Sequence, residues 1–400
     1  MQKNLHCAEK PRELGSAKKL LRVLRISHSG SVTAYRERER KLIESFAVEV
    51  KLIIPERWQH LGGDENSVSE VFEVVKAKTY GTGSIPLFAY DYRTIARYLK
   101  EFRPDLVDIH EEPYSVSCFE IVQLVERIHP EAACVFYSAQ NIHKRYPPPF
   151  CWTERYVYRT CVGAYPCSSG VKDVLVAKGY DVNSQVIPLG VDPVAFRPMR
   201  VDRSNHALRD ASFVVGYLGR LEECKGLEYV FRALRDLPDG IDWQMLVVGN
   251  GSYKSQLQKL AAELSIQERI VWVGEISANN VSEYINLCDV TVVPSVTTAT
   301  WKEQFGRAVI ESMACGVPII ASDSGSLPEV VGEAGIVVPE KNSQALFESL
   351  SALANNVELR QSLRERGLQK VEREYTWARV AELTYDFYQN ALELKHSRAN

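Results

Sequence analysis

The chain has 400 residues, 45% hydrophobic and 25% charged, with a formal net charge of −3. This length exceeds one ordinary hydrophobic core and predicts two domains, while the slightly acidic balance argues against a nucleic-acid partner. No apolar run approaches the ~20 residues that span a bilayer. The unpatterned cysteines, and residues 1–19 without an apolar core, predict a cytoplasmic protein with reduced thiols and no metal site.

Residues 1–19 are expected to be an N-terminal extension, and residues 20–195 to form the first α/β domain. Its buried strands are expected at Leu21–Ser27, Val48–Ile54, Leu106–His110, Cys134–Tyr137 and Ala164–Cys167, with a helix at Tyr92–Lys100. Strands that alternate with helices predict a parallel sheet with crossover connections.

Residues 196–210, with Pro198 and several charges, are typical of a linker to a second α/β domain at residues 211–376. Strands are expected there at Phe213–Leu218, Gln244–Val248, Ile270–Val273, Val290–Pro294, Val317–Ala321 and Gly335–Val338. A final helix is expected at Ala378–Leu394, within residues 377–400. The predicted fold class is therefore α/β, with two Rossmann-like parallel-sheet domains.

The segment Trp301–Pro328 places two carboxylates, Glu303 and Glu311, around Phe305-Gly306-Arg307-Ala308. Apolar residues at helical spacing after Gly306 predict a helix that begins near this point. Its free N–H groups and positive dipole end favour an anion such as phosphate, and Gly306 lets that anion approach the backbone. For a strand-loop-helix segment taken alone, a capping Glu303 and a solvated Glu311 are the favoured interpretation.

A basic loop follows the first strand of the second domain. Arg220 comes after the strand, and Lys225-Gly226 precedes the next helix. Two cations at a helix N-terminus suit a diphosphate, since Arg can grip phosphate oxygens bidentately while Lys acts as a point charge. Glu222 and Glu223 leave a surface salt-bridge loop as the alternative.

The Glu303–Glu311 segment resembles the E-x7-E signature of the GT-B glycosyltransferases of family 4, a retaining and metal-independent group. Four other motifs of this family occur in the expected order, at Val186–Asp192, Gly216–Gly226, Val247–Gly251 and Val271–Glu275. The resemblance covers roughly residues 20–390. It implies two domains that face each other across a cleft, and a final helix that crosses back to the first domain.

This resemblance implies a hexosyltransferase that uses no cofactor. The hexose would pass from a UDP- or GDP-sugar to a hydroxyl of a glycan, lipid or small-molecule acceptor, in cell-surface polysaccharide or glycolipid biosynthesis. Arg220, Lys225 and the amides of Phe305, Gly306, Arg307 and Ala308 would stabilise the departing diphosphate. Glu303 would hold the sugar, Glu311 the ribose, Glu275 and Ile276 the surroundings of the base, and Gly30 would approach the diphosphate.

The first domain is expected to hold the acceptor. His110-Glu111-Glu112-Pro113 follows a strand and resembles the H-E-P of the phosphatidylinositol mannosyltransferases, with one additional Glu. The additional residue leaves the match of Glu111 or Glu112 open. His110 is predicted to be catalytic, in contact with the donor sugar or the acceptor. His110, Glu111, Gln140 and Asn141 are predicted to bind the acceptor, because α/β ligands lie at the carboxyl ends of strands.

Two stretches bear on membrane contact. The charge run Arg36–Lys41 on the first helix is typical of a solvated face with paired charges. Tyr146–Trp152 combines aromatic residues with prolines, and it suits a lid, a membrane-surface contact or packing between domains. Peripheral contact with the inner face of a membrane therefore stays open beside the cytoplasmic location.

Two other functions compete with the transferase. A dinucleotide-dependent oxidoreductase requires G-x-G-x-x-G, and Gly249-Asn250-Gly251 supplies only its first two glycines. A non-catalytic nucleotide-sugar-binding protein on the same fold is the second alternative. The joint presence of Arg220, Lys225, Glu303 and Glu311 argues against it, because binding alone would not need all four.

Overall fold

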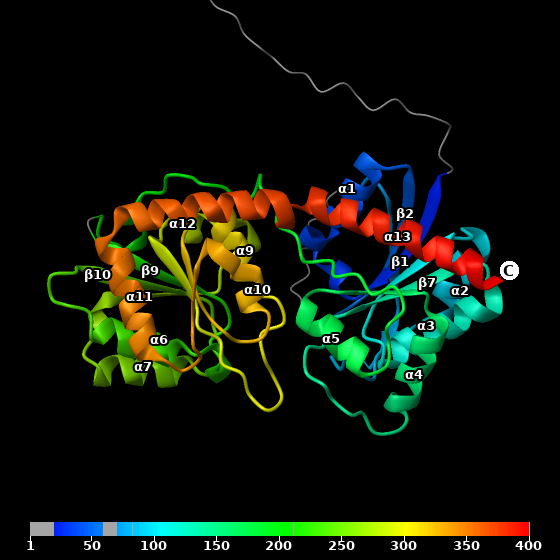
Figure 1. Ribbon diagram of the computed structural model, residues 1–400, viewed down its shortest axis with the longest axis horizontal. Helices are drawn as coiled ribbons and strands as arrows, with labels where there is room; N and C mark the ends of the chain where they lie inside the picture. The colour runs from blue at the N-terminus through cyan, green and yellow to red at the C-terminus, as the bar shows by residue number, and fades with distance from the viewer. Residues whose placement is uncertain (1–19, 59–69, 82, 211, 400) are drawn as a thin grey trace, which may run out of the picture.

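The computed structural model describes residues 20–58, 70–81, 83–210 and 212–399 of the chain. Figure 1 shows two α/β halves side by side, and each half contains a six-stranded sheet. The strand pairs within both sheets are parallel. The predicted fold class, two Rossmann-like parallel-sheet domains, is thereby confirmed.

The first sheet has the strand order β3-β2-β1-β6-β7-β8. Its strands are β1 (Leu21–Ser27), β2 (Val48–Pro55), β3 (Glu73–Ala77), β6 (Leu106–His110), β7 (Ala133–Ser138) and β8 (Gly163–Pro166), and β4 (Thr79–Tyr80) pairs with β5 (Ala89–Tyr90) outside it. The helices are α1 (Glu37–Ser45), α2 (Tyr92–Glu101), α3 (Val116–Ile128), α4 (Phe150–Thr160) and α5 (Ser169–Ala177). The strand order reverses between β1 and β6, and ligands of open α/β sheets bind outside the carboxyl ends of strands at such a point.

The sequence does not predict β3, the edge strand of this sheet. Glu73 and Lys76 are exposed, and Val74 and Val75 are only half-buried. Charged side chains are a common means of blunting a sheet edge. Because they interrupt the apolar run, β3 lacks the pattern that identifies the buried strands.

The second sheet has the order β11-β10-β9-β12-β13-β14 and reverses between β9 and β12. Its strands are β9 (Phe213–Leu218), β10 (Trp243–Val248), β11 (Ile270–Gly274), β12 (Val290–Val293), β13 (Ile319–Ser322) and β14 (Ile336–Val338). The helices are α6 (Leu227–Arg235), α7 (Lys254–Glu263), α8 (Val281–Asn286), α9 (Arg307–Ala314), α10 (Leu327–Val331), α11 (Ser343–Asn355) and α12 (Val357–Lys370).

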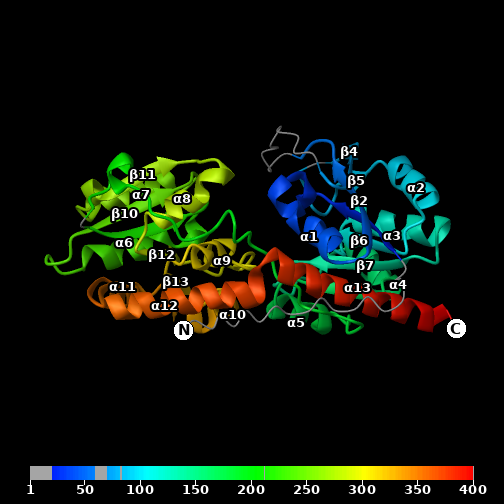
Figure 2. The same cartoon turned by 90° about the horizontal axis from the view of Figure 1, so that it is seen from above.

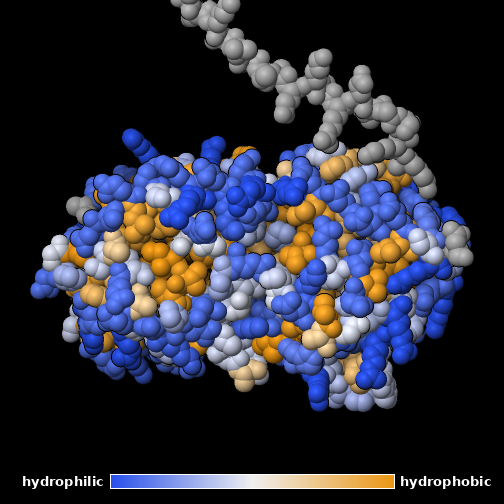
Figure 3. Space-filling model, viewed as in Figure 1, coloured by the Kyte–Doolittle hydropathy of each residue, from blue (hydrophilic) through white to orange (hydrophobic). Residues whose placement is uncertain are grey.

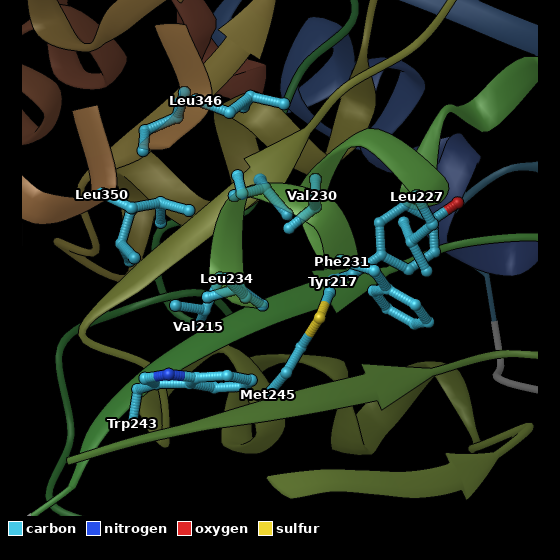
Figure 4. Packing of buried hydrophobic residues seen from close by; sticks show 14 of the residues in the cluster. Val215, Tyr217, Leu227, Val230, Phe231, Leu234, Trp243, Met245, Leu346 and Leu350 are labelled. Atoms are coloured by element: carbon cyan, nitrogen blue, oxygen red, sulfur yellow. The ribbon is translucent and has the colours of Figure 1, made fainter. Parts of the chain in front are cut away.

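A hydrophobic core lies between the second sheet and helices α6 and α11, and Figure 4 shows its packing. The strands contribute Val215, Tyr217, Trp243 and Met245, and the helices contribute Leu227, Val230, Phe231, Leu234, Leu346 and Leu350. Full burial of each large side chain stabilises the fold by about 1.5–3 kcal/mol. This packing fixes β9 and β10, and the loops at their carboxyl ends therefore start from rigid strands.

A helical segment connects the two halves. α12 continues through a π-helical turn at Val371–Tyr375 into α13 (Trp377–Ala399), which runs along the first half in both Figures 1 and 2. On α13, Trp377, Phe387 and Tyr388 are buried in the same cluster as residues of the first sheet. The last helix therefore packs on the first half although it follows the second half in the chain.

Among the described residues, no helix combines the length and the apolar character needed to cross a membrane. The face in Figure 3 is largely hydrophilic, and hydrophobic side chains gather in separate areas over both halves. Exposed apolar side chains are normal on globular proteins, because there is too little polar surface to cover the whole molecule.

Candidate active site

The loops after β9 and β12 bring Lys225 and Glu303 together. These strands are neighbours at the point where the strand order reverses. Lys225 Nζ lies 2.8 Å from Glu303 Oε2, and the Ser295 hydroxyl donates to the same oxygen at 2.8 Å. Lys225 Nζ also lies 4.5 Å from the centre of the Trp301 ring. The side chains of Lys225 and Glu303 are 17% and 14% exposed, so a ligand can reach both.

The backbone of Glu303 is held from both halves. Its carbonyl oxygen accepts hydrogen bonds from the Ser326 N–H at 3.1 Å and from the Asn141 amide at 2.7 Å. A Cβ on Gly325 would lie 1.9 Å from that oxygen, so only glycine permits this close approach. Asn141 follows β7 in the first half, and its hydrogen bond therefore joins the two halves at the loop that carries Glu303.

Helix α9 begins directly after Gly306, which has the left-handed φ of +86°. A Cβ at this position would also lie 2.4 Å from Leu327 Cδ2. The preceding Phe305 is buried and packs edge-to-face on Tyr375, with ring centroids 5.9 Å apart. Phe305 is therefore an anchor in the core, and what it can offer a ligand is its backbone.

Arg307, Ala308 and Glu311 occupy the first turns of α9. The Arg307 guanidinium lies 4.2 Å from the ring centre of Tyr35 in the first half, which gives a second contact between the halves. Ala308 and Glu311 are half-buried. Burial raises the pKa of Glu311 to about 7, and the charge of Arg307 acts in the opposite direction.

Arg220 pairs with a different carboxylate from Lys225. Its side chain is 71% exposed and forms an ion pair with Glu222 at 2.9 Å. Within the basic loop, Lys225 therefore pairs with Glu303, whereas Arg220 takes part in a surface salt bridge.

The loops after β9, β10 and β11 lie along one edge of the second sheet. Gly249 fits closely against the first of them, since its Cβ would lie 2.0 Å from the carbonyl oxygen of Gly219. Its φ of +127° is a second reason for glycine. Glu275 and Ile276 follow β11, where Glu275 is exposed and Ile276 is half-buried. Neither contacts the Lys225–Glu303 pair through a hydrogen bond among the described residues.

Gly30 lies in the turn after β1 and is buried. Its Cβ would lie 3.1 Å from Ile54 Cγ2 and 3.3 Å from Leu52 Cδ2, so the turn is packed tightly on β2. Its carbonyl oxygen accepts a hydrogen bond from Arg36 at 2.7 Å. The structure thus gives a packing reason for this glycine, independent of any ligand.

Glu111 and Glu112 are adjacent in the chain but bind different partners. Glu111 accepts from the His28 N–H at 2.8 Å and lies 2.5 Å from His28 Nδ1. Burial opposes the charged imidazolium, but the charge and hydrogen bond of Glu111 raise the pKa of His28 above its ordinary value. Glu112 accepts from Ser138 and from the Ala139 N–H at 2.8 and 2.7 Å. Burial raises the pKa of Glu112 to about 7, although these two hydrogen bonds act to lower it.

A buried charge network lies beneath this edge of the first sheet. Arg38 bonds Asp108 at 2.5 Å and Glu39 at 2.9 Å, and Glu39 also pairs with Arg25. Tyr388 of α13 donates to Asp108 at 2.6 Å. The interpretation of the charge run on the first helix as a solvated face is therefore wrong for Arg38 and Glu39, which are 4% and 2% exposed. The sequence period could not reveal this, because their partners lie on β1, β6 and α13.

The remaining cations of the charge run are paired nearer the surface. Arg36 and Arg40 both bond Glu70, at 3.0 and 2.8 Å. Lys41 bonds Glu44 at 2.7 Å. Each cation of the run therefore has a carboxylate partner within the described part of the chain, which weakens the run as an anionic-membrane contact.

The loop after β7 carries Gln140 and Asn141. Gln140 donates from Nε2 to the Tyr146 hydroxyl at 3.2 Å, and it accepts from the Ile142 N–H at 3.1 Å. Asn141 is buried, and its amide nitrogen donates a hydrogen bond to the Glu303 carbonyl oxygen. Farther on, Tyr146 stacks on Tyr114, with ring centroids 4.2 Å apart. This loop therefore makes contacts within the first half and across to the second.

A cavity of about 390 Å³ opens where the halves meet. The first half contributes Arg25, His28, Arg38, His110, Glu111, Glu112, Tyr137 and Tyr165, the second contributes Gln304 and Arg307, and α13 contributes Trp377 and Val380. The predicted residues His110, Glu111 and Arg307 thus share one cavity wall. Polar groups from both switch points surround a space large enough for a sugar-sized ligand.

Two family descriptions match successive parts of the chain. Residues 40–194 match Glycosyltransferase Family 4, and residues 199–370 match Glycosyl transferases group 1. The chain belongs to the family 4, group 1 glycosyltransferases. Together the two matches include the loops after β9 and β12 and most of the first half.

Individual relatives are similar to this glycosyltransferase over part of their length. A D-inositol 3-phosphate glycosyltransferase of Stackebrandtia nassauensis is 29% identical over 222 residues, covering 52% of this chain and 49% of that protein. A GDP-mannose-dependent alpha-(1-6)-phosphatidylinositol monomannoside mannosyltransferase of Mycolicibacterium smegmatis is 32% identical over 177 residues, covering 42% and 46%. The chain spans about half the length of the curated relatives it matches. HepE of Anabaena in complex with UDP has a TM-score of 0.72 at 14% identity, covering 92% of this chain and 98% of that one, and has the same GT-B fold.

Several residues that shape the candidate site carry no local sequence signal. Arg25 and Asp108 lie inside apolar strands and acquire their role from partners far away in the chain. Ser295 and Trp301 lie between β12 and α9, where Ser295 contacts Glu303 and Trp301 contacts Lys225. Gly325 differs from them, because the Asp323-Ser324-Gly325 pattern near the end of the signature segment is typical of a turn.

Proposed function

We propose that this glycosyltransferase moves a hexose, with retention and without a metal ion, from a UDP- or GDP-sugar to a hydroxyl of a glycan, lipid or small molecule. The observation that carries the proposal is the Lys225–Glu303 pair at 2.8 Å, set where the strand order reverses. The GDP-mannose dependence named for the Mycolicibacterium smegmatis relative and the UDP named for Anabaena HepE support a nucleotide-sugar donor.

The donor diphosphate is proposed to displace Glu303 from Lys225. When the bond between sugar C1 and the diphosphate oxygen breaks, negative charge develops on the diphosphate and positive charge on the sugar ring. The Lys225 ammonium and the first amides of α9 stabilise the departing diphosphate as fixed donors. Arg220 leaves Glu222 and adds a bidentate contact.

Glu303, released from Lys225, accepts hydrogen bonds from sugar hydroxyls and favours the oxocarbenium-like state. The bond from Ser295 stays in place and keeps the carboxylate oriented. Glu311 accepts from ribose hydroxyls one turn along α9. For retention, the acceptor oxygen attacks C1 from the face that the diphosphate leaves, and a diphosphate oxygen takes the acceptor proton. This route needs no protein nucleophile.

The proposal places this reaction in cell-surface polysaccharide or glycolipid biosynthesis, on the cytoplasmic side. A peripheral membrane contact would use the first half, where Trp152 on α4 is 62% exposed. Co-sedimentation with anionic vesicles, compared between the wild type and Trp152→Ser, tests this part. Binding that the substitution leaves unchanged would remove Trp152 from the contact.

The experiment that tests the proposal is a titration of the purified chain with UDP, GDP and ADP in the presence of a chelator. Saturable binding of one nucleotide is expected, and it names the donor class. Turnover of the corresponding sugar conjugate then separates an enzyme from a nucleotide-sugar-binding protein. Folded protein that binds none of the three nucleotides would contradict the proposal.

A further inference from the structure

His110 is held by its ring face and by one of its two ring nitrogens. The imidazole stacks on Tyr137, with centroids 3.9 Å apart and planes inclined by 15°. Its Nδ1 lies 3.2 Å from an Arg25 guanidinium nitrogen and 3.1 Å from the Tyr165 hydroxyl oxygen. No described residue hydrogen-bonds Nε2, and the half-exposed side chain lines the cavity between the halves. The nitrogen left for a ligand is therefore Nε2.

The partners of Nδ1 determine where the ring proton resides. A guanidinium has only N–H donors, so Nδ1 must accept from Arg25 through its lone pair. The Tyr165 hydroxyl already donates to Asp108, so its oxygen favours a proton on Nδ1, whereas Arg25 opposes one. The contact with Arg25 is the stronger of the two, because hydrogen bonds from an ionised donor are roughly twice as strong as neutral ones. A proton on Nδ1 would point at the Arg25 N–H groups, and two donors would then face each other. The neutral ring therefore carries its proton on Nε2.

The surroundings also oppose a charged imidazolium. Burial, followed by the charges of Arg38 and His28, lowers the pKa of His110 well below its ordinary value. Charged and titratable groups surround the site of the ring on several elements. Those that share its cavity are Arg25, Arg38, Tyr137, Tyr165, His28, Glu111 and Glu112. Glu39, Asp108 and Tyr388 belong to the buried network that includes Arg25 and Arg38. The carboxylates Glu39 and Asp108 are bonded to the arginines, and Glu111 is bonded to His28.

We infer that Arg25 is a positioning residue that fixes the tautomer of His110, so that a neutral imidazole donates its Nε2–H to an oxygen atom of the bound substrate. The inference rests on the proposed function for the identity of that substrate, a nucleotide sugar or its acceptor. His110 is then a hydrogen-bond donor throughout the reaction. It takes no proton from the acceptor, which agrees with a route in which the departing diphosphate accepts it.

The tautomer can be measured directly in the ligand-free protein. Long-range proton–nitrogen NMR spectra of the ¹⁵N-labelled chain distinguish a protonated from an unprotonated ring nitrogen, and His110→Gln assigns the signals. The expected result is an unprotonated Nδ1 and a protonated Nε2, unchanged as the pH passes through the ordinary histidine pKa of ~6.5. A protonated Nδ1 in the wild type, or titration near that pH, would overturn the inference.

Substitutions distinguish the effect of Arg25 on the tautomer from that of Tyr165, the other partner of Nδ1. Arg25→Met is expected to give a mixture of tautomers and a kcat about tenfold lower at neutral pH, the effect of roughly one hydrogen bond. Arg25→Lys keeps a cationic donor and should restore the Nε2–H form. Tyr165→Phe removes the competing oxygen and should leave the tautomer unchanged. A tautomer that changes in Tyr165→Phe but not in Arg25→Met would assign the control to Tyr165.

Arg22→Met is the matched control on the same strand, because Arg22 is part-exposed and pairs with Glu49 at 3.5 Å. It should change neither the tautomer nor kcat. If Arg25→Met does not fold, the wild-type spectrum with Arg25→Lys and Tyr165→Phe still tests the inference. Since the spectra need no turnover, a wrong tautomer refutes the role of Arg25 alone. A correct tautomer in a chain without any transferase activity refutes the proposed function instead.

Discussion

The two halves share a six-stranded parallel sheet but hold their functional side chains by different means. In the second half, the Glu303 side chain is held by Lys225 and the Ser295 hydroxyl, and its backbone carbonyl also accepts from Asn141 of the first half. In the first half, His110 depends on Arg25 and on a buried charge network that reaches α13. The charges of Lys225 and Glu303 thus stay partly exposed, whereas Arg25, Arg38, Glu39 and Asp108 in the first half are buried and paired with one another.

The largest effect on stability is expected at Asp108, which is fully buried and bonded to Arg38 and Tyr388. Asp108→Asn leaves Arg25 and Arg38 to share the single carboxylate of Glu39, so one positive charge is uncompensated in the protein interior. We expect the free energy of unfolding to fall by about 3–5 kcal/mol. Urea denaturation of the wild type and the variant measures this difference. A variant as stable as the wild type would mean that the network does not support the first half.

The matching change in the second half should affect chemistry before stability. Glu303→Ala removes the carboxylate that we assign to the sugar, and kcat should fall about 100-fold while donor affinity changes less. Initial rates and nucleotide-sugar binding separate the two effects. Glu348→Ala on the exposed side of α11 is the control and should behave as the wild type. Unchanged turnover in Glu303→Ala would refute the site assignment.

The elements that sequence reasoning located are those with a local signal. β1, β6 and β9 have the predicted bounds because apolar residues predominate in them and most of their residues are buried. The signature segment likewise placed Glu303 at a loop and Glu311 on a helix. The E-x7-E segment therefore carries information about the local fold.

The parts that escaped prediction depend on contacts between distant segments. Tyr388 and Asp108 are 280 residues apart, and Asn141 and Glu303 are 162 apart. Hydrophobic periodicity does not encode such pairs, because it describes only how a segment meets the core. The burial of Arg38 and Glu39 was missed for the same reason.

A smaller effect is expected from Glu311, whose pKa is raised to about 7. Ribose hydroxyls donate to the ionised carboxylate, so nucleotide affinity should increase as the pH rises through about 7. The same shift makes the folded state relatively less stable as the pH rises above the unfolded carboxyl value, because the buried group resists ionisation. Glu311→Gln should lower affinity about tenfold, the loss of roughly one charged hydrogen bond, and flatten its pH dependence. Calorimetry at pH 6, 7 and 8 checks both expectations, and a wild-type affinity independent of pH would contradict them.

The smallest effect is expected at the surface of the same charge run that supplies Arg38. Lys41 bonds Glu44 at 2.7 Å, and their side chains are 37% and 56% exposed. Lys41→Ala should change the free energy of unfolding by less than ~0.5 kcal/mol. Denaturation beside Asp108→Asn gives the contrast between exposed and buried charges. A loss at Lys41 as large as at Asp108 would remove the distinction drawn within this run.

The central claim is that the Lys225–Glu303 loops hold a nucleotide sugar and promote cleavage of its bond to the diphosphate. The most direct measurement is release of nucleoside diphosphate from UDP- and GDP-sugars by the purified chain, with a chelator present and with glycan and lipid acceptors supplied. The account predicts release from one class of donor, lost in Glu303→Ala. Saturable binding of a nucleotide sugar without any release, under all acceptor conditions, would contradict it and indicate a binding protein on the same fold.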